Sequence, residues 1–396
     1  MKDLKEKIKK AAIKFLPEII EIRRHFHANP ELSLEEIQTS KFIESKLRGM
    51  KIVLIKKIAK TGIVALIEGK NPLSKTTTLR ADMDALPIDE ENNVAYKSLK
   101  KNIMHACGHD VHMASLLGTA KILSGLKNEF NGTVKLIFQP SEEKLPGGAL
   151  LMIKGGALEK PKSDNIIGQH VLSTLEVGKI GLKTGKYMAS TDEIYITVKG
   201  KGGHAATPEL NIDPVLIASH IVVALQQIVS RNATPGVPTV LSFGRFIADG
   251  RTNVIPDEVR IEGTIRTFDE SWRNIAHKKI IKMAQLIAES MGGTCDIFID
   301  KGYPYLVNDT LLTNKVKDYA IEYLGKNNVV DIDMRMTAED FAYYSQKIPA
   351  CFYRLGVRND KKGITSNIHT SSFNVDEKSL EIGMGLMSWI AIRALS

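Results

Sequence analysis

Short apolar runs that alternate with helical patterns constrain the fold of this chain more than any other feature. Runs of strand length lie at 62–68, 77–81, 134–138 and 165–168. A helical pattern at 109–126 separates the second run from the third, as a crossover between parallel strands requires. We therefore expect an α/β fold, with a mostly parallel sheet and helices on both of its faces.

Polar clusters directly follow three of these runs. They contain Asp82 and Asp84, then Glu142 and Glu143, and then His170. Ligands of open α/β sheets bind beyond the carboxyl ends of the strands. The placement of these clusters therefore predicts a functional site at that edge of the sheet.

The chain is long enough to form more than one domain. Its 396 residues exceed what one compact core usually contains. Near residue 185 the pattern changes to a half-exposed strand at 193–199, which is followed by helices and strands in an α+β order. We expect a first domain made of 1–185 and 300–396, with a smaller α+β domain inserted at 186–299.

The charge balance of the chain is moderately basic. There are 54 Lys and Arg residues against 45 Asp and Glu residues, which gives a formal net charge of +9. The lysines are spread among glutamates and form no basic stripe with interleaved aromatic residues, so no nucleic-acid partner is expected. The excess positive charge would still attract a small anionic substrate.

Apolar segments and cysteines favour a cytoplasmic protein. No apolar run is expected to reach the length that spans a bilayer, so no membrane partner is expected. The amphipathic helix at 3–28 is expected to dock on a domain core, and the charged start lacks an apolar core of secretory length. Cys107, Cys295 and Cys351 are too few and too far apart for a disulfide framework.

A cluster of histidines contains one of the cysteines. His105, His109 and His112 fall within eight residues that also include Cys107. Thiolate and imidazole groups are ligands of zinc and neighbouring transition metals, and Gly108 would let the backbone turn so that Cys107 and His109 face one point. A buried cysteine beside histidines at a helix start is an equally weighted alternative for this cluster alone.

The adjacent acids Glu142 and Glu143 strengthen the metal interpretation. Alone they would be interpreted as solvated loop residues. Beside a metal, one carboxylate can coordinate while the other takes a proton from metal-bound water. No Gly-x-Ser-x-Gly, phosphate-loop, His-Glu-x-x-His or Cys-x-x-Cys pattern indicates another chemistry.

Two possible roles stay open for each of Asp84, His170 and His369. Asp82 and Asp84 alternate at a strand end, so their side chains are expected on opposite faces. Asp84 either holds the outer nitrogen of a histidine ligand or caps a helix or turn. His170 and His369 are isolated, and such histidines are more often structural than ligands.

Seven motifs carry a family resemblance along nearly the whole chain. In order, they are RRHFHANPEL (23–32), RADMDALP (80–87), MHACGHD (104–110), FQPSEE (138–143), GGHAA (202–206), TNVIP (252–256) and TAEDF (337–341). The chain resembles the amidohydrolase branch of the co-catalytic metallopeptidase family that includes aminoacylase and glutamate carboxypeptidase. Within this branch it is most similar to N-acyl-amino-acid amidohydrolases, hippurate hydrolases, auxin-conjugate hydrolases and N-acetyldiaminopimelate deacetylases.

The resemblance implies a role for each matching position. It implies two divalent metals, with Cys107 as the bridging ligand. The remaining ligands would be His109, Glu143, His170 and His369. It further implies that Glu142 is the general base and that Asp84 is an acid behind the ligands.

The inserted domain would serve as a lid and dimerisation domain. There, the resemblance implies that His204 polarises the scissile carbonyl and can reach a neighbouring subunit's site. Asn253 and Arg266 would bind substrate, and the planar fork of an arginine suits a free carboxylate.

The implied activity is hydrolysis of N-acyl amino acids to a carboxylic acid and a free amino acid by metal-bound water, in a homodimer or a dimer-based oligomer. Zn, Mn, Co or Ni would suit the ligands. A carboxypeptidase or dipeptidase on the same site is the main alternative, and a non-catalytic binding protein is a second. The chain departs from the family pattern at 168–173, 144–148 and 370–371, which removes no ligand but leaves the acyl specificity open.

Overall fold

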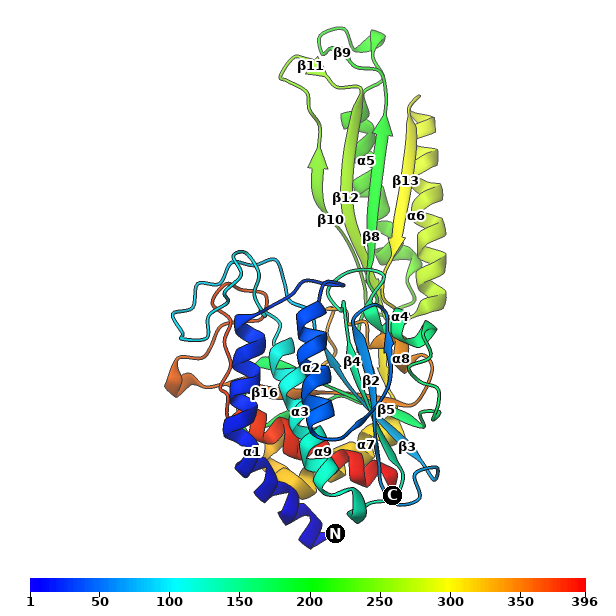
Figure 1. Cartoon of the computed structure of the whole chain (residues 1–396). Coiled ribbons are helices and arrows are strands. Elements are labelled where there is room, and N and C mark those ends of the chain that lie inside the picture. Colours follow the sequence, from blue (N-terminus) through cyan, green and yellow to red (C-terminus); the bar gives the residue numbers. More distant parts are fainter. The chain divides into compact units, whose positions relative to one another are not determined.

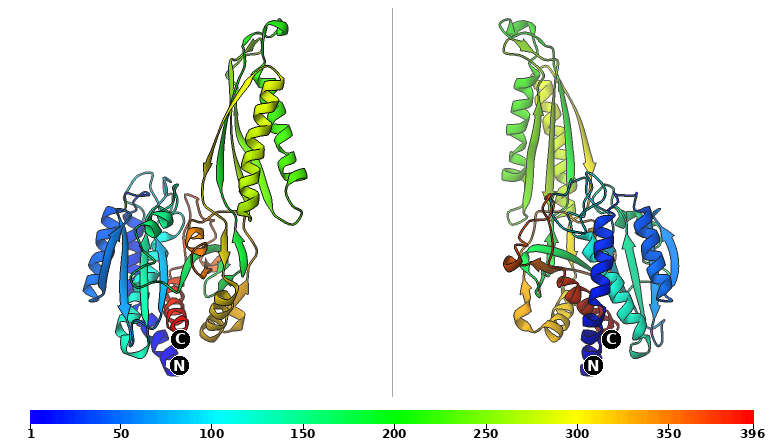
Figure 2. Two further views of the ribbon diagram at one scale, coloured as in Figure 1. Left: turned by 90° about the vertical axis from the view of Figure 1, so that its right-hand side faces the viewer. Right: turned by 60° about the vertical axis from the view of Figure 1, so that its left-hand side comes forward.

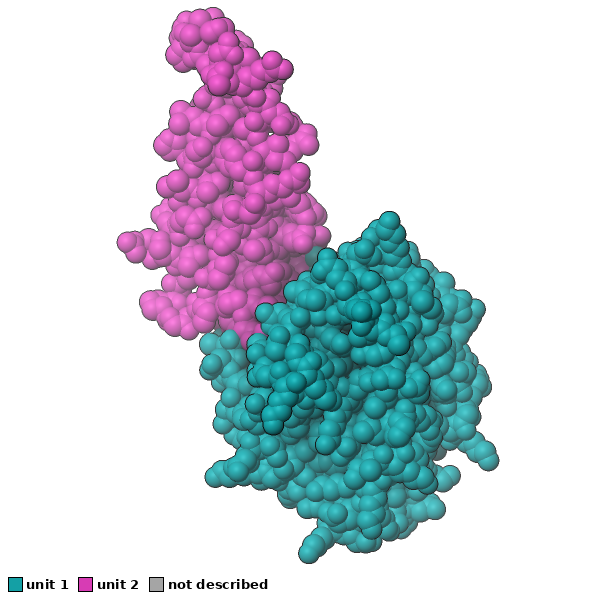
Figure 3. All heavy atoms as spheres, turned by 90° about the vertical axis from the view of Figure 1, so that its left-hand side faces the viewer, with its two compact units in different colours: residues 1–187, 307–334, 340–396 teal, residues 188–306, 335–339 magenta. Residues whose placement is uncertain are grey.

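The computed structural model describes the backbone of residues 1–396 and the side chains of residues 1–53 and 57–396. The chain forms two compact units, which Figures 1 and 3 show. Unit 1 comprises Met1–Tyr187, Val307–Met334 and Asp340–Ser396, and unit 2 comprises Met188–Leu306 and Arg335–Glu339. The inserted domain was expected at 186–299. Unit 2 begins two residues later, continues to Leu306 and also includes Arg335–Glu339.

Unit 1 is built on an eight-stranded mixed sheet. In order across the sheet, its strands are β1 (Val53–Ile58), β2 (Gly62–Glu68), β4 (Thr133–Gln139), β3 (Thr76–Asp82), β5 (Asn165–Glu176), β16 (Ala350–Arg358), β6 (Ile180–Leu182) and β15 (Val329–Asp331). The central strands β4, β3, β5 and β16 are parallel, while the pairs β1–β2, β2–β4 and β6–β16 are antiparallel. The predicted α/β fold with a mostly parallel sheet is confirmed.

Helices cover both faces of this sheet. They are α1 (Lys2–Ala28), α2 (Ile37–Gly49), α3 (His109–Gly125), α4 (Gly148–Lys154), α7 (Thr310–Leu324), α8 (Ala342–Ser345) and α9 (Ser379–Leu395). A Cβ atom added to Gly168 of β5 would meet Phe341, while Gln169 lies against Gly383 of α9. Successive residues of a strand point to opposite faces, so α9 lies on one face and the segment before α8 on the other.

Burial explains why these segments form the core of unit 1. β3 and β4 are buried along their whole length, as expected for parallel strands that are covered on both faces. α3 and α9 are almost completely buried and mainly apolar, whereas α1 buries only one side. α1 packs against both of these helices, so the amphipathic N-terminal helix docks on the core.

Unit 2 is a two-layer α+β unit. Its antiparallel sheet has the order β10 (Thr239–Ile247), β12 (Glu258–Thr267), β8 (Asp192–Lys199) and β13 (Thr294–Lys301). Helices α5 (Pro214–Leu225) and α6 (Glu270–Ser290) pack on one face of it (Figure 2). β8 alternates buried and more exposed residues, which is the period of a strand covered on one face.

Two short strand pairs complete the described strands. β9 (Gly203–His204) and β11 (Val254–Ile255) form a two-stranded ribbon in unit 2. β7 (Gly185–Met188) pairs with β14 (Leu306–Asn308), and in these two strands the chain passes between the units.

One helical stretch of unit 2 bears on the expectation that no apolar run is long enough to span a bilayer. Pro214–Asn232 is long and apolar enough to cross a membrane by length and composition alone, with a mean hydropathy of 1.3 and 33% of its window buried. Polar residues interrupt the stretch, so it is not a continuous apolar run. Ile217, Ile221 and Leu225 recur at helical spacing and are buried against the sheet, as in a core helix.

Candidate metal centre

The turn between Cys107 and His109 depends on the glycine between them. Gly108 begins α3 with φ +82°, in the left-handed region that glycine adopts without strain. A Cβ atom at this position would also lie 2.5 Å from a methyl group of Val171. The glycine therefore lets the chain turn sharply and places the thiol and the imidazole on the same side.

Cys107 lies at the centre of the predicted ligands. Its Sγ is 3.4 Å from Nε2 of His170 and 3.3 Å from Nε2 of His369. Ligand atoms of Cys107, His109 and His170 lie within 4.8 Å of one another, and so do those of Cys107, Glu143 and His369. Because Cys107 belongs to both groups, its sulfur is placed to be shared by two ions.

The backbone holds His369 beside this thiol. Its N–H donates to the carbonyl of Ala106 at 2.8 Å, and its φ of +62° lies in a region that few residues other than glycine adopt. Such conformations are found mainly where the surrounding structure enforces them, often at functional sites. The side chain of His369 is half exposed, unlike the other three nitrogen and sulfur donors.

The electrostatics of the cluster favour cations. Burial and the neighbouring carboxylates, with Glu143 first among them, raise the pKa of the Cys107 thiol well above its usual range. Burial alone would lower the pKa of His109, but Asp82 and Asp84 outweigh it and raise that pKa to about 10. A divalent ion would compensate this negative charge and allow the thiolate to form.

Two buried atoms that lack hydrogen-bond partners show whether these residues suit divalent ions. Nε2 of His109 and Oε1 of Glu143 are buried without a hydrogen-bond partner, and they lie 3.8 Å apart. Leaving such groups unpaired costs about 1–3 kcal/mol each, more for charged groups. Sulfur, imidazole and carboxylate donors that converge in this way fit two divalent transition-metal ions.

Asp84 supports the site from behind. Its carboxylate accepts the backbone N–H groups of Glu142 and Glu143 at 2.9 and 3.0 Å and the hydroxyl of Ser33 at 2.6 Å. Its backbone carbonyl accepts Nδ1–H of His109 at 2.8 Å, so that Nε2 faces the cluster. The outer nitrogen of His109 is thus held mainly by the carbonyl, with carboxylate Oδ1 at 3.4 Å.

Asp82 and Asp84 were expected to point to opposite faces, and the side chains of both lie against the ring of His109. Oδ2 of Asp82 lies 3.7 Å from Nε2 of His109, and Asp84 lies on the other side of the same ring. β3 ends at Asp82, so the strand alternation does not extend to Asp84.

Glu142 lies beside the donor cluster. A carboxylate oxygen of Glu142 lies within 4.8 Å of ligand atoms of His109 and Glu143. The side chain is buried, and its Oε1 accepts the backbone N–H of Asp340 at 3.3 Å. This carboxylate is within reach of a molecule held by the cluster, as a general base has to be.

The other three predicted residues belong to unit 2. His204 and Asn253 are neighbours on the β9–β11 ribbon, where Ala205 N–H donates to the carbonyl of Asn253 at 3.1 Å. Arg266 lies on β12, half buried, and donates to the carbonyl of Met336 at 3.2 Å. Their substrate roles stay predictions.

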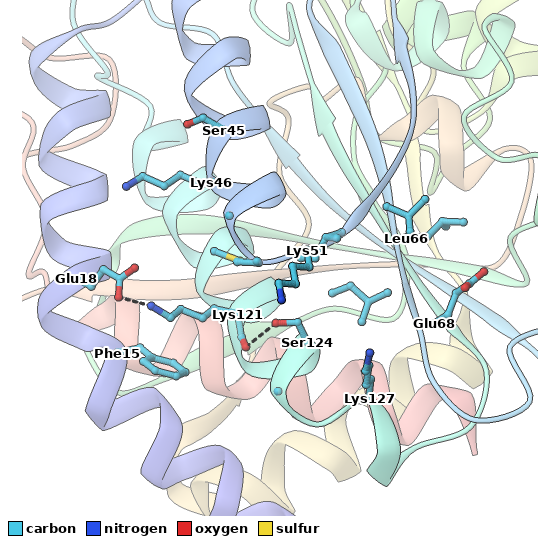
Figure 4. Close-up of a pocket in the computed structure, with 16 residues that line it drawn as sticks. Phe15, Glu18, Ser45, Lys46, Lys51, Leu66, Glu68, Lys121, Ser124 and Lys127 are labelled. Atoms are coloured by element: carbon cyan, nitrogen blue, oxygen red, sulfur yellow. Dashed lines mark hydrogen bonds and ion pairs between the residues drawn. The ribbon is translucent and has the colours of Figure 1, made fainter.

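A groove elsewhere on unit 1 contains none of the predicted site residues. It has a volume of about 860 Å³ and is lined by α1, α2, the end of α3 and β2 (Figure 4). Lys46 and Lys51 lie near the carboxyl end of α2 and Lys121 and Lys127 near that of α3, where cations interact favourably with the helix dipole. These lysines therefore have a structural explanation that requires no ligand.

His112 was expected only as a member of the histidine cluster. It lies on the first turn of α3, three residues after His109, and is buried between His109 and His170. Its hydrogen bonds depend on how distant strands pack, so they could not be predicted from the sequence. The one signal in the sequence was its spacing of three residues from His109, which places both histidines on one side of a helix.

Similarity to known proteins extends over nearly the whole chain. Residues 78–392 match the family model described as peptidase family M20/M25/M40. The chain is 38% identical over 394 residues to thermostable carboxypeptidase 2 of Saccharolobus solfataricus, with 99% of each chain covered. It is 40% identical over 363 residues to N-acetyl-L-cysteine deacetylase of Bacillus subtilis, with 92% of this chain and 85% of the relative covered.

A solved structure agrees with these relatives. A dinuclear metal-binding peptidase of family M20 from Bacillus subtilis matches with a TM-score of 0.83 at 34% identity, with 96% of this chain and 99% of that chain covered. The family resemblance of the motifs is therefore confirmed. The chain belongs to peptidase family M20/M25/M40.

Proposed function

We propose that this protein is a metal-dependent amidohydrolase that cleaves N-acyl amino acids to a carboxylic acid and a free amino acid. The observation that carries the proposal is the convergence of four other metal-ligand side chains on Cys107, with the Glu142 carboxylate beside them. Relatives named as amidohydrolases and as an N-acetyl-L-cysteine deacetylase support the substrate class.

The metal ligands proposed are Cys107, His109, Glu143, His170 and His369. Two divalent ions bound by them would supply Lewis-acid polarisation of the scissile carbonyl and lower the pKa of water. Asp84 keeps the loop of Glu142 and Glu143 and the ring of His109 in place. Zn, Mn, Co and Ni all suit these ligands, and reconstitution with each metal in turn identifies the ion that supports activity.

Glu142 moves the proton in the proposed reaction. Its carboxylate accepts a proton from the attacking water and then donates it to the nitrogen of the leaving amino acid. His204 donates a hydrogen bond to the carbonyl oxygen as negative charge develops there, a contribution of about 3–4 kcal/mol per donor. The Nδ1 of His204 accepts the N–H of Ala206 at 3.0 Å, which leaves Nε2–H available as that donor.

Substrate binding is assigned to two residues of unit 2. Arg266 is proposed to pair with the free carboxylate of the substrate, which its planar guanidinium can bind through two hydrogen bonds. Asn253 is proposed to contact the substrate near His204, its neighbour on the ribbon. The net charge of +9 supports attraction of such an anion.

We further propose a homodimer in a reducing cytoplasm. Leu216 and Val223 of α5 are 50% and 74% exposed, and these apolar side chains support an interface on unit 2. All three cysteines are free, which supports a reducing compartment.

A carboxypeptidase or dipeptidase is the second candidate. The relative from Saccharolobus solfataricus is named a thermostable carboxypeptidase, and the same site could cleave a peptide bond next to a free carboxylate. The two activities differ in the group on the acyl side of the scissile bond.

A substrate panel tests the proposal. Metal-free protein, reconstituted in turn with Zn, Mn, Co or Ni, is given N-acetyl amino acids, N-benzoyl amino acids and dipeptides. We expect faster release of free amino acid from the N-acyl compounds, and a loss of about 10²–10⁴-fold in kcat for Glu142→Gln with both ions retained. Faster cleavage of the dipeptides would favour the peptidase, and wild-type turnover by Glu142→Gln would remove Glu142 as the base.

A further inference from the structure

His112 is a buried imidazole with both ring nitrogens engaged by the protein. Its Nδ1 lies 2.5 Å from Oδ1 of Asp82, and its Nε2 accepts the backbone N–H of Val171 at 2.9 Å. A backbone N–H can only donate, so Nε2 carries no proton. The remaining proton is on Nδ1, which donates to Asp82, and His112 has no nitrogen left for a metal.

Asp82 is itself fixed. Its second oxygen, Oδ2, accepts Nη1–H of Arg80 at 2.5 Å, and Arg80 also donates to Gln139 and Asp340 at 2.9 Å each. All of these side chains are buried. The carboxylate therefore has one orientation, and it selects one tautomer of His112.

The position of Val171 explains why His112 is needed there. The parallel ladder between β3 and β5 ends at the pair Arg80 and Gly168, although β3 continues to Asp82. Further along β5, Val171 is paired with Leu355 on the β16 side. The imidazole of His112 thus accepts an N–H at a point where β5 no longer has β3 as a neighbour.

Val171 in turn orients one of the proposed metal ligands. Its carbonyl accepts Nδ1–H of His170 at 2.8 Å, which presents Nε2 of His170 to Cys107. The ring of His112 also packs directly against that of His170, with centroids 4.6 Å apart. A continuous path of contacts therefore runs from Asp82 through His112 and the backbone of Val171 to His170.

We propose that His112 is a positioning residue. Asp82 holds it in its Nδ1–H tautomer, and His112 fixes the backbone on either side of Val171 and thereby the orientation of His170. This inference rests on the proposed metal site but not on the identity of the substrate. Residues that orient metal ligands in this way commonly change metal affinity by about 10–100-fold when they are replaced.

Cobalt binding to chelator-stripped protein tests this role. His112→Phe fills the same space without either hydrogen bond, whereas His112→Gln has a donor and an acceptor for the same two partners. We expect His112→Phe to bind at least one Co²⁺ about tenfold or more weakly and to change the visible absorption of that ion. We expect His112→Gln to restore most of the affinity and the wild-type spectrum.

Leu117→Ala is the matched control, because Leu117 is a buried apolar residue of the same helix that belongs to the hydrophobic core and has no metal-ligating group. It should lower the free energy of unfolding and leave cobalt binding unchanged. Wild-type cobalt affinity in His112→Phe, or an equal loss in Leu117→Ala, would overturn the positioning role. If the wild type itself bound no cobalt, the proposed function would fail instead.

The tautomer provides a test that does not need metal or a folded Phe variant. In metal-free protein labelled with ¹⁵N-histidine, the signals that disappear in His112→Gln belong to His112. We expect an unprotonated Nε2 and a protonated Nδ1 in these signals. A protonated Nε2 would contradict the hydrogen bond from Val171 and the proposal with it.

Discussion

Cys107 is the residue on which both halves of the proposed metal site depend. Its sulfur belongs to the group with His109 and His170 and to the group with Glu143 and His369. Burial and the nearby carboxylates raise the pKa of the thiol, so the charged form is unfavourable there unless cations are bound. Metal binding and thiol ionisation are therefore expected to occur together.

We predict that Cys107→Ala loses both ions, because each half of the site then lacks one of its donors. Elemental analysis of the purified protein measures the metal content per chain. Cys295→Ala is the control, since Cys295 is a buried cysteine of unit 2 that belongs to neither donor group. Unchanged metal content in Cys107→Ala would exclude a ligand role for this residue.

At the residue scale, the side chains that converge on Cys107 could be named from the motifs and the family resemblance, but the contacts that hold them in place could not. Cys107, His109 and Glu143 lie in motifs whose residue types indicate metal binding. The carbonyl of Asp84 as the partner of His109 depends on where β3 ends, and the use of His112 depends on where the β3–β5 ladder ends. Both contacts depend on where the strands end and how they are paired, which cannot be derived from the spacing of the motifs.

At the element scale, apolar runs predicted the central strands because parallel strands are buried on both faces. The runs expected at 77–81 and 134–138 lie within β3 and β4. The three-residue strands β6 and β15 have no such signal, because so few residues show no periodicity. The apolar character of Pro214–Asn232 is also hard to recognise in the sequence, because scattered polar residues divide it into short apolar runs.

Aspartates cap three of the helices and help to define where they begin. Asp213, Asp269 and Asp309 accept backbone N–H groups in the first turns of α5, α6 and α7. Such side chains satisfy donors that have no partner within the helix.

Asp309→Ala is predicted to lower the free energy of unfolding by about 1 kcal/mol, because the N–H of Leu312 loses its acceptor. Asp309→Asn keeps an oxygen acceptor at the same place and should stay within a few tenths of a kcal/mol of the wild type. Urea denaturation of both variants measures the difference. Equal destabilisation by Ala and Asn would show that charge, and not the cap, matters at this position.

At the scale of a whole unit, a buried charge network joins α1 to α3. Asp110 is 2.8 Å from Nε of Arg23 and 2.8 Å from Nδ1 of His27. Burial would raise the pKa of Asp110, but Arg23 and His27 outweigh it and hold that pKa well below its usual range. Because its folded-state pKa is depressed, the Asp110 carboxylate stabilises the fold above its unfolded pKa of about 3.9, and this contribution is lost as the pH falls.

Asp110→Asn is predicted to be about 3–5 kcal/mol less stable than the wild type at pH 7, because it removes the nearer of the two carboxylates that pair with the buried Arg23 and leaves only Glu377, at 3.5 Å. Below about pH 4 the difference should shrink by about 1.4 kcal/mol per pH unit, since only the wild type takes up a proton there on unfolding. Urea unfolding of metal-free protein between pH 3 and pH 7 measures this difference. A constant difference over that range would mean that the pKa of Asp110 is the same in the folded and the unfolded protein, and would contradict the depressed pKa.

At the scale of the whole molecule, the proposed reaction needs a residue of unit 2 at a metal site in unit 1. Seven of the ten predicted site residues belong to unit 1, and His204, Asn253 and Arg266 belong to unit 2. We propose that, in a homodimer, His204 of one subunit would serve the metal centre of the other. A symmetric dimer would then contain two sites that each need both chains.

A heterodimer of two inactive chains tests this arrangement. Chains with Glu142→Gln and chains with His204→Ala, carrying different tags, are expressed together, and the mixed dimer is purified through both tags. If His204 acts across the dimer, one of the two sites has both residues intact, and about half of the wild-type activity returns. If His204 acts within its own chain, neither site is complete and the mixed dimer stays inactive. Failure to isolate any mixed dimer, with both chains folded, would contradict the homodimer itself.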